Sequence, residues 1–303
     1  MKISRLFMTA ALIATLAPPA HALISIAEKN ARDAREAKLK TKPSSAPAPK
    51  AASSKRFRVV LDPGHGGIDH GTTYEGHPPV AEKDMTLMLA RQVAAQLKAR
   101  GIDVTFTRDG DYEMPLGART ALANKVGADV FLSIHLNSTP GLNPALAEGV
   151  ETYILNHESD STSKRLAQLE NQVIGGTAQQ GDVALILKDL QLDATLPESK
   201  RLACMIQERV AAINPKQAAT PHPLTVTSNR GVRQALFFVL LGADMPSALI
   251  EAGFLSNPHD RSWLLSVQGQ KAFGESVARA INLFRMQKNT ALGQRTLSTC
   301  KVH

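Results

Sequence analysis

Two histidines and two glutamates stand where catalytic groups are often found in α/β proteins. His65 lies in a glycine-rich turn after an apolar run, and His135 ends a second apolar run. Glu82 opens a stretch with helical spacing, and Glu251 ends a later apolar run. Two imidazoles and one carboxylate suit a catalytic zinc ion whose fourth position is open to water. The fourth residue, a spare carboxylate, suits the proton transfers of a metal-assisted hydrolysis.

The elements around these residues predict an α/β fold. Apolar runs alternate with stretches of helical periodicity, and no internal repeat is present, so we expect a single domain with helices on both faces of a mixed, mostly parallel sheet. In such sheets functional groups gather at the carboxyl ends of the strands, where we place the zinc site. The expected strands span 57–61, 102–107, 130–135, 150–155 and 248–251, and the expected helices span 82–100, 116–126 and 268–287.

The N-terminal residues 1–22 have the pattern of a secretory signal peptide. Lys2 and Arg5 precede an apolar run too short for a stable membrane span, and Ala20-His21-Ala22 forms an A-x-A cleavage site. We therefore expect cleavage after Ala22 and an exported, periplasmic protein. Residues 23–56 follow as a basic linker rich in Pro, Ala and Ser. The catalytic domain is expected over 57–288, before a polar tail at 289–303.

The formal charge of +8 belongs to the leader and the linker. Beyond residue 56 the chain carries 24 basic and 24 acidic residues. A nucleic-acid partner is therefore not indicated. The two cysteines are too few for a disulfide framework. An oxidising compartment permits a bridge between Cys204 and Cys300, although a buried free thiol at Cys204 is the more common outcome.

Five ordered segments carry a family resemblance. They are Val59-Val60-Leu61-Asp62-Pro63-Gly64-His65-Gly66-Gly67, Glu82-Lys83-Asp84, Ser133-Ile134-His135-Leu136-Asn137-Ser138, Gly149-Val150-Glu151-Thr152-Tyr153 and the run from Met245 to Asn257. In this order they resemble the zinc-dependent N-acetylmuramoyl-L-alanine amidases, over about residues 57–284. The resemblance implies one zinc ion (Zn2+) per chain, held by His65, Glu82 and His135, with Glu251 as the catalytic carboxylate and peptidoglycan as the substrate.

Two alternatives to an active amidase stay open. The chain could be an inactive, amidase-like binding or regulatory protein of the envelope, although all four chemical residues are present. It could also be another zinc amidohydrolase or carboxypeptidase of the envelope. An amidase would release free stem peptides that begin with L-alanine, whereas a peptidase would leave shortened stems.

Residues 158–228 interrupt the α/β pattern. They contain two helix-like stretches, Ser163–Ile174 and Pro197–Ile213. The segment resembles the extra helical insert of the periplasmic cell-division amidases, which covers the active site until an activator protein displaces it. This resemblance predicts a regulatory insert over the zinc site, with Glu170 approaching the open metal position. The structural alternative is a pair of helices that merely extend the core.

Overall fold

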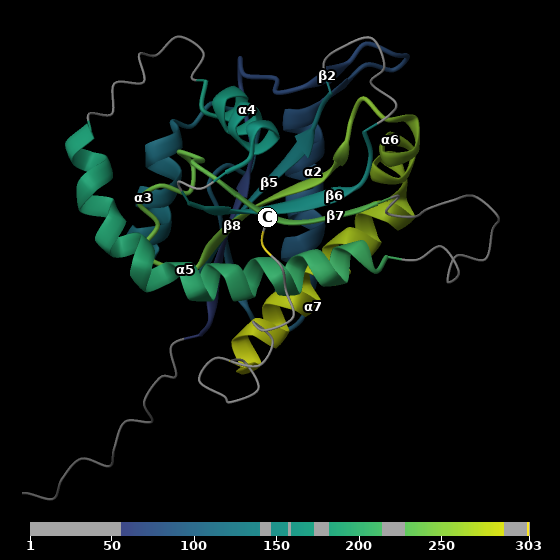
Figure 1. The fold of residues 1–303 in the computed structure, drawn as a ribbon. Coiled ribbons are helices and arrows are strands. Elements are labelled where there is room, and N and C mark those ends of the chain that lie inside the picture. Colours follow the sequence, from purple (N-terminus) through teal and green to yellow (C-terminus); the bar gives the residue numbers. More distant parts are fainter. Residues whose placement is uncertain are drawn as a thin grey trace, which may run out of the picture. The chain divides into compact units, whose positions relative to one another are not determined.

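In the computed structural model a six-stranded mixed sheet forms the centre of the fold (Figure 1). The strand order is β4-β1-β5-β8-β6-β7. Neighbouring strands are parallel except for β6 and β8, so the predicted mixed, mostly parallel sheet is confirmed. The strands are β1 (Arg58–Pro63), β4 (Asp103–Phe106), β5 (Val130–Asn137), β6 (Val150–Leu155), β7 (Asn229–Ala235) and β8 (Ser247–Phe254).

The structure describes residues 56–139, 147–156, 159–172, 182–213, 228–287 and 302, with side chains left out at 182–194. The predicted signal peptide, nearly all of the linker and all of the tail except Val302 lie outside these residues. Within the described ranges, no helix has both the length and the apolar character that crossing a bilayer requires.

Helices cover both faces of the sheet, as predicted. Alternate strand residues enter two separate hydrophobic clusters: Val59 and Leu61 belong to one, and Val60 belongs to the other. The first cluster lies against α2, α5 and α7, and the second receives side chains from α3 and α4. The helices are α2 (Glu82–Lys98), α3 (Leu116–Val126), α4 (Ser161–Glu170), α5 (Asp182–Ala211), α6 (Pro258–Leu265) and α7 (Val267–Gln287), and β2 (Thr73–Tyr74) pairs with β3 (Val80–Ala81) in a short ribbon.

The structure divides the predicted insert into two helices with different positions. In α5, Leu202, Ile206 and Val210 are fully buried in the first cluster, with α2 and α7. The α5 helix is therefore a core helix, and the prediction that the whole insert lies over the site is wrong for it. It also begins earlier than expected and continues through Pro197. The shorter α4 places Leu166 and Ala167 in the second cluster, on the other face of the sheet.

Two further elements and one bond differ from the sequence-based expectation. Strand β7 and helix α6 are not predicted by apolar periodicity, although Asn257 caps α6 and Pro258 opens it. Cys204 is disulfide-bonded and not a free thiol. The chain's other cysteine, Cys300, lies outside the described residues.

The core position of α5 is testable by mutation. We expect Ile206→Ala to lower the free energy of unfolding by about 2–5 kcal/mol, because the truncated side chain leaves a cavity in a fully buried site. Met286→Ala is the control, since this side chain is 66% exposed and its loss should change stability by less than ~0.5 kcal/mol. Denaturant unfolding of both variants measures the difference, and equal stabilities would contradict the core assignment.

Candidate metal centre

The loop after β1 brings its histidine to the carboxyl edge of the sheet. His65 has a left-handed backbone conformation, with φ of 60°, which non-glycine residues rarely adopt. Gly64 lets this loop approach β5, because a Cβ there would lie 2.4 Å from the ring of His135. Gly71 leaves room for Glu82 in the same way, since its Cβ would lie 2.6 Å from Glu82 Oε2. The glycines of the loop are thus required by the close packing around the site.

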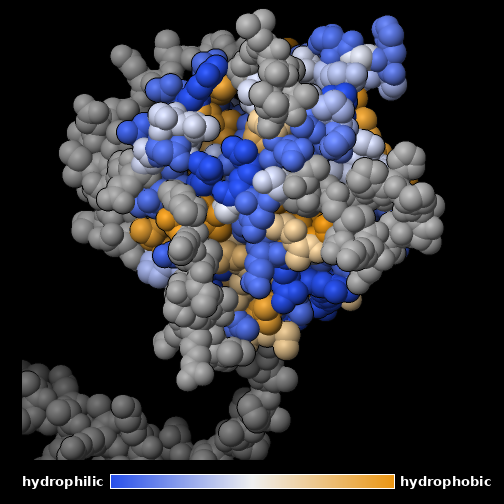
Figure 2. All heavy atoms as spheres, turned by 45° about the vertical axis from the view of Figure 1, so that its right-hand side comes forward, coloured by the Kyte–Doolittle hydropathy of each residue, from blue (hydrophilic) through white to orange (hydrophobic). Residues whose placement is uncertain are grey.

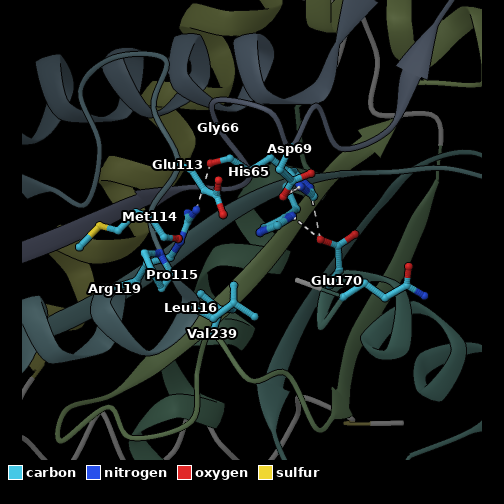
Figure 3. Close-up of a pocket in the computed structure, with 12 residues that line it drawn as sticks. His65, Gly66, Asp69, Glu113, Met114, Pro115, Leu116, Arg119, Glu170 and Val239 are labelled. Carbon is cyan, nitrogen blue, oxygen red and sulfur yellow. Dashed lines mark hydrogen bonds and ion pairs between the residues drawn. The ribbon is translucent and has the colours of Figure 1, made fainter. Parts of the chain in front are cut away.

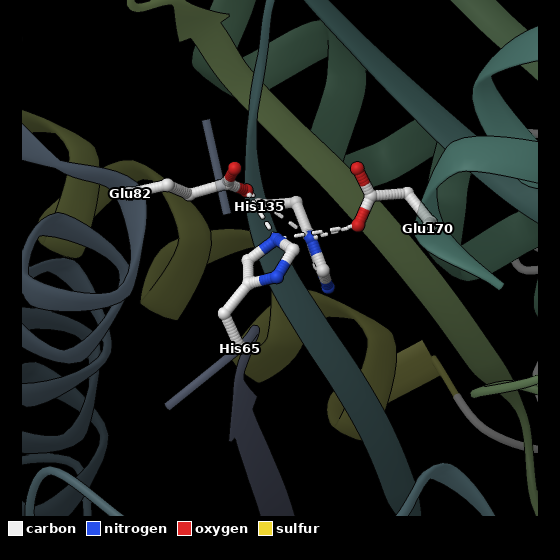
Figure 4. Close-up of side chains that lie close together, drawn as sticks. All are labelled: His65, Glu82, His135 and Glu170. Atoms are coloured by element: carbon white, nitrogen blue, oxygen red, sulfur yellow. Dashed lines mark ion pairs between the residues drawn. The ribbon is translucent and has the colours of Figure 1, made fainter. Parts of the chain in front are cut away.

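Four side chains from four separate segments converge at this edge (Figure 4). His65 Nε2 lies 3.1 Å from Glu82 Oε1 and 3.3 Å from Glu170 Oε2. His135 Nδ1 lies 3.2 Å and 2.9 Å from the same two oxygens. All four potential ligand atoms lie within 4.8 Å of one another. The structure thus brings together the three predicted ligands and Glu170, which comes from the last residue of α4.

These atoms fit a bound metal ion. His65 Nε2, His135 Nδ1 and Glu170 Oε2 are buried and have no hydrogen-bond partner. Buried polar atoms without partners are rare in native proteins and are often found where an ion binds or at functional groups. Two imidazole nitrogens and carboxylate oxygens are the ligand types that zinc takes. The donor set therefore supports a divalent metal site, with Glu170 at a fourth ligand position.

The first histidine is oriented by Asp69, which sequence reasoning did not single out. Asp69 Oδ2 lies 2.9 Å from His65 Nδ1, and Asp69 Oδ1 accepts a hydrogen bond from the amide of Gly71. A proton held on Nδ1 leaves Nε2 unprotonated and facing the other ligand atoms. The spacing of four residues within a glycine-rich loop is the only local signal that could have indicated this pair.

Asp62, at the end of β1, is buried behind the metal loop. It accepts hydrogen bonds from Thr107, Arg119 and Ser133, at 2.5, 2.9 and 2.7 Å. The Arg119 guanidinium also donates to the carbonyl oxygen of His65. Asp62 therefore supports the metal loop indirectly, through a buried ion pair, and Ser133 is occupied as a hydrogen-bond donor.

Carboxylates dominate the electrostatics of the centre. Burial by itself would lower the pKa of His135, but the nearby Glu170 and Glu82 carboxylates outweigh burial and raise this pKa to about 10. The pKa of His65 is likewise raised well above its usual value, against the effect of burial, mainly by Glu82. Burial opposes ionisation of Glu82, yet the two imidazoles hold its pKa below the usual value. Glu82 is therefore ionised, and protons on the two imidazoles compensate its charge. A metal ion bound at this site would take the place of those protons.

Glu251 lies beside the ligand set and not within it. It is fully buried on β8, in register with His135 on β5, and neither carboxylate oxygen has a hydrogen-bond partner. Burial, together with the negative charge of Glu170, raises its pKa well above the usual value. A raised pKa suits a group that must both accept and donate a proton. The structure therefore places Glu251 next to His135 and outside the cluster of four potential ligand residues.

A small pocket opens next to the metal centre (Figure 3). The two histidines and Glu170 line one side of it, and Met114, Leu116 and Val239 supply apolar surface on the other. On the face of the molecule drawn in Figure 2, hydrophilic and hydrophobic side chains are interspersed. The pocket therefore adjoins the metal centre and offers both polar and apolar contacts.

Comparison with known proteins decides the family. The model of the N-acetylmuramoyl-L-alanine amidase family matches residues 59–283. The chain belongs to this amidase family. It is 36% identical to the amidase AmiA of Salmonella typhimurium over 256 residues, which cover 82% of this chain and 81% of that protein. Its identity to AmiA of Escherichia coli is 35%, covering 78% of this chain and 77% of the relative.

Solved amidase structures share the fold. An N-acetylmuramoyl-L-alanine amidase from Clostridium difficile superposes with a TM-score of 0.57 at 27% identity, covering 78% of this chain and all of the other. The amidase AmiC2 of Nostoc punctiforme gives a TM-score of 0.54 at 28% identity, covering 76% and 97% of the two chains. The amidase fold over the central part of this chain is therefore shown by both sequence and structure.

The role of Asp69 in this amidase can be tested through metal affinity. We expect Asp69→Ala to weaken metal binding by about 10–100-fold, because His65 loses the partner that holds its ring. Glu75→Ala is the matched control, since it removes an exposed carboxylate from the neighbouring connection between β2 and β3. Competition with a chromophoric chelator measures the affinity, and His65→Ala serves as the reference for loss of a ligand. Wild-type affinity in Asp69→Ala would contradict the positioning role.

Proposed function

We propose that the protein is a zinc-dependent peptidoglycan hydrolase that cleaves the amide between N-acetylmuramic acid and L-alanine. The observation that supports this most strongly is the set of two imidazoles and one carboxylate beside a separate buried carboxylate. The relatives named N-acetylmuramoyl-L-alanine amidases support the choice of bond. His65, Glu82 and His135 are the permanent ligands in this proposal, with one zinc ion per chain.

The chain's own residues divide the chemistry between binding and proton transfer. Zinc bound at this site would polarise the amide carbonyl and increase the acidity of water. Glu251 accepts the proton of the attacking water and returns it to the nitrogen of L-alanine as that amine leaves. Asp69 keeps His65 in the tautomer that presents Nε2.

The proposed location is the periplasm. The pattern of residues 1–22 supports export, with cleavage after Ala22, and residues 23–56 would then tether the catalytic domain. Relatives named N-acetylmuramoyl-L-alanine amidases are consistent with an envelope enzyme. The biological role in this proposal is cell-wall remodelling or separation of daughter cells.

We further propose that α4 inhibits the enzyme by occupying the metal centre. Glu170 Oε2 lies 2.9 Å from His135 Nδ1 and 3.3 Å from His65 Nε2, where a fourth ligand would bind. A carboxylate there competes with water and substrate for the open position. Activity then requires displacement of α4, which is the proposed task of an activator protein.

Digestion of purified peptidoglycan tests the reaction. The zinc-loaded protein should release stem peptides that begin with a free L-alanine, identified by mass spectrometry. Shortened stem peptides would instead indicate a carboxypeptidase or another amidohydrolase. Intact peptidoglycan at full zinc occupancy, even after removal of Glu170, would indicate a binding protein without activity.

A mutation at Glu251 can distinguish a role in catalysis from a role in metal binding. We expect Glu251→Gln to keep its zinc and its fold while the cleavage rate falls by about 10²–10⁴-fold, because glutamine cannot accept the proton. Metal analysis and the digestion assay measure the two properties on the same preparation. Near-wild-type cleavage by this variant would refute the proposed mechanism.

Inhibition by α4 predicts a gain of activity. We expect Glu170→Ala to raise basal hydrolysis about tenfold or more, because the closed state loses its contact with the metal centre. Gln168→Ala is the matched control, since this exposed residue lies on the same helix. Release of dye from labelled peptidoglycan compares the variants at equal zinc content. Equal basal rates for Glu170→Ala and the control would end the inhibition proposal.

A further inference from the structure

A row of charged side chains continues from the metal centre across the sheet. His135 on β5 is in register with Glu251 on β8, and Glu251 pairs with Glu151 on β6. Residues paired in this way point to the same face of the sheet. Strand spacing places Glu151 about 10 Å from His135 along the row. The face involved is the one that α3 and α4 cover, because neighbouring residues such as Ile134 and Ile250 enter the opposite cluster.

The next strand adds two arginines to this row. Between β6 and β7 the register shifts, so that three steps on β7, from Asn229 to Val232, match two steps on β6. Gly231 lies within this bulge, with φ of 85°. In a regular strand, residues three apart would point to opposite faces, but here Arg230 and Arg233 both reach Glu151. Their Nε atoms lie 3.2 and 2.9 Å from its carboxylate oxygens.

The second arginine also contacts the helix that carries Glu170. Arg233 Nη1 lies 2.7 Å from Asp160 Oδ2. Asp160 is the N-cap of α4, and its other oxygen accepts a hydrogen bond from the amide of Ser163. Helix α4 therefore places one carboxylate at the metal centre, with its last residue, and another at Arg233, with the residue before its first turn. Both contacts are lost together if α4 leaves.

Displacement of α4 would leave the two arginines with a net positive charge. Glu151 is 1% exposed and neutralises one of the two guanidinium groups. Without Asp160, the pair of arginines retains one uncompensated positive charge. The side chains of Arg230 and Arg233 are 26% and 19% exposed even with α4 in place, so a ligand can reach them. A guanidinium group binds a carboxylate through two parallel hydrogen bonds, which matches one anionic group of a substrate.

We propose that Arg230 and Arg233 form a subsite for a carboxylate of the substrate's stem peptide, and that Asp160 occupies it when α4 is docked. The inference rests on the proposed amidase function, and it names the group that the enzyme recognises beyond the cleaved bond. Two residues of extended peptide span about 7 Å, so an acidic residue following L-alanine reaches from the scissile amide toward Glu151. Glu151 holds the two arginines in place and is a positioning residue.

Two small substrates test this subsite. They are muramoyl peptides that differ only in the residue after L-alanine, which carries a free carboxylate in one and a carboxamide in the other. The measured quantity is the ratio of their kcat/KM values. Only the fraction of protein in which α4 is displaced cleaves either substrate. This fraction is the same for both, so inhibition by α4 cancels in the ratio of the kcat/KM values. For the wild-type protein we expect about tenfold preference for the carboxylate.

The variants separate recognition from a structural role. Arg233→Ala should lower the ratio to about 1, mainly through a higher KM for the carboxylate substrate, and Arg233→Lys should restore part of the preference. Arg279→Ala, which removes an exposed arginine from α7, should leave the ratio unchanged. Asp160→Asn keeps the helix cap but weakens the ion pair, so it should raise both rates and preserve the ratio.

Each result has a distinct meaning. A wild-type ratio of 1, or a preference that survives in a folded Arg233→Ala variant, would overturn the subsite. Cleavage of neither substrate by zinc-loaded protein, even with Glu170→Ala, would overturn the proposed amidase function and the subsite with it. Arg233→Gln serves as the second variant if thermal unfolding shows that Arg233→Ala does not fold.

Discussion

Three carboxyl groups are gathered at one buried point in the described part of this protein. Glu82 and Glu251 are almost fully buried, and Glu170 faces the same two imidazoles. Buried carboxylates are stable only when a positive partner compensates them. A cation bound between the imidazoles would compensate the carboxylates, and it would also be the missing partner of the buried ligand atoms that have no hydrogen bond. Strand register, the glycines of the loop and the end of α4 together bring these side chains to one place.

Two buried arginines hold the loop that carries the first histidine. Arg108 donates to the carbonyl oxygens of Pro63 and Gly64, and Arg119 donates to that of His65. Asp62 compensates the charge of Arg119. These bonds fix the backbone before a metal or substrate binds, so that little conformational freedom remains to be lost. The left-handed conformation of His65 is tolerated because the surrounding contacts determine it.

The two helices of the insert differ in how much apolar contact holds them to the rest of the fold. The α5 helix buries a row of side chains against α7 and the sheet, and its loss would expose the core. In α4, Leu166 and Ala167 are buried, whereas Leu169 is 45% exposed. A ten-residue helix with so little apolar contact is a weakly held element, of the kind that opens locally in other proteins. Its polar contacts are those of Glu170 at the metal centre, of Asp160 with Arg233, and of the C-cap residue Asn171 with the backbone of Leu236 and Phe238.

The amino-acid sequence by itself determined the α/β class and most of the strands, because apolar periodicity and glycine-rich turns depend on neighbours along the chain. The candidate ligands and the spare carboxylate came from the family resemblance of five ordered segments, not from local periodicity. Strand β7 escaped prediction because its sequence, from Asn229 to Ala235, is mostly polar. Only the tertiary structure decided that Asp69 orients His65 and that Arg230 and Arg233 meet at Glu151. Those contacts depend on strand register, a bulge and the placement of α4, which arise from pairings between distant segments and not from any local pattern.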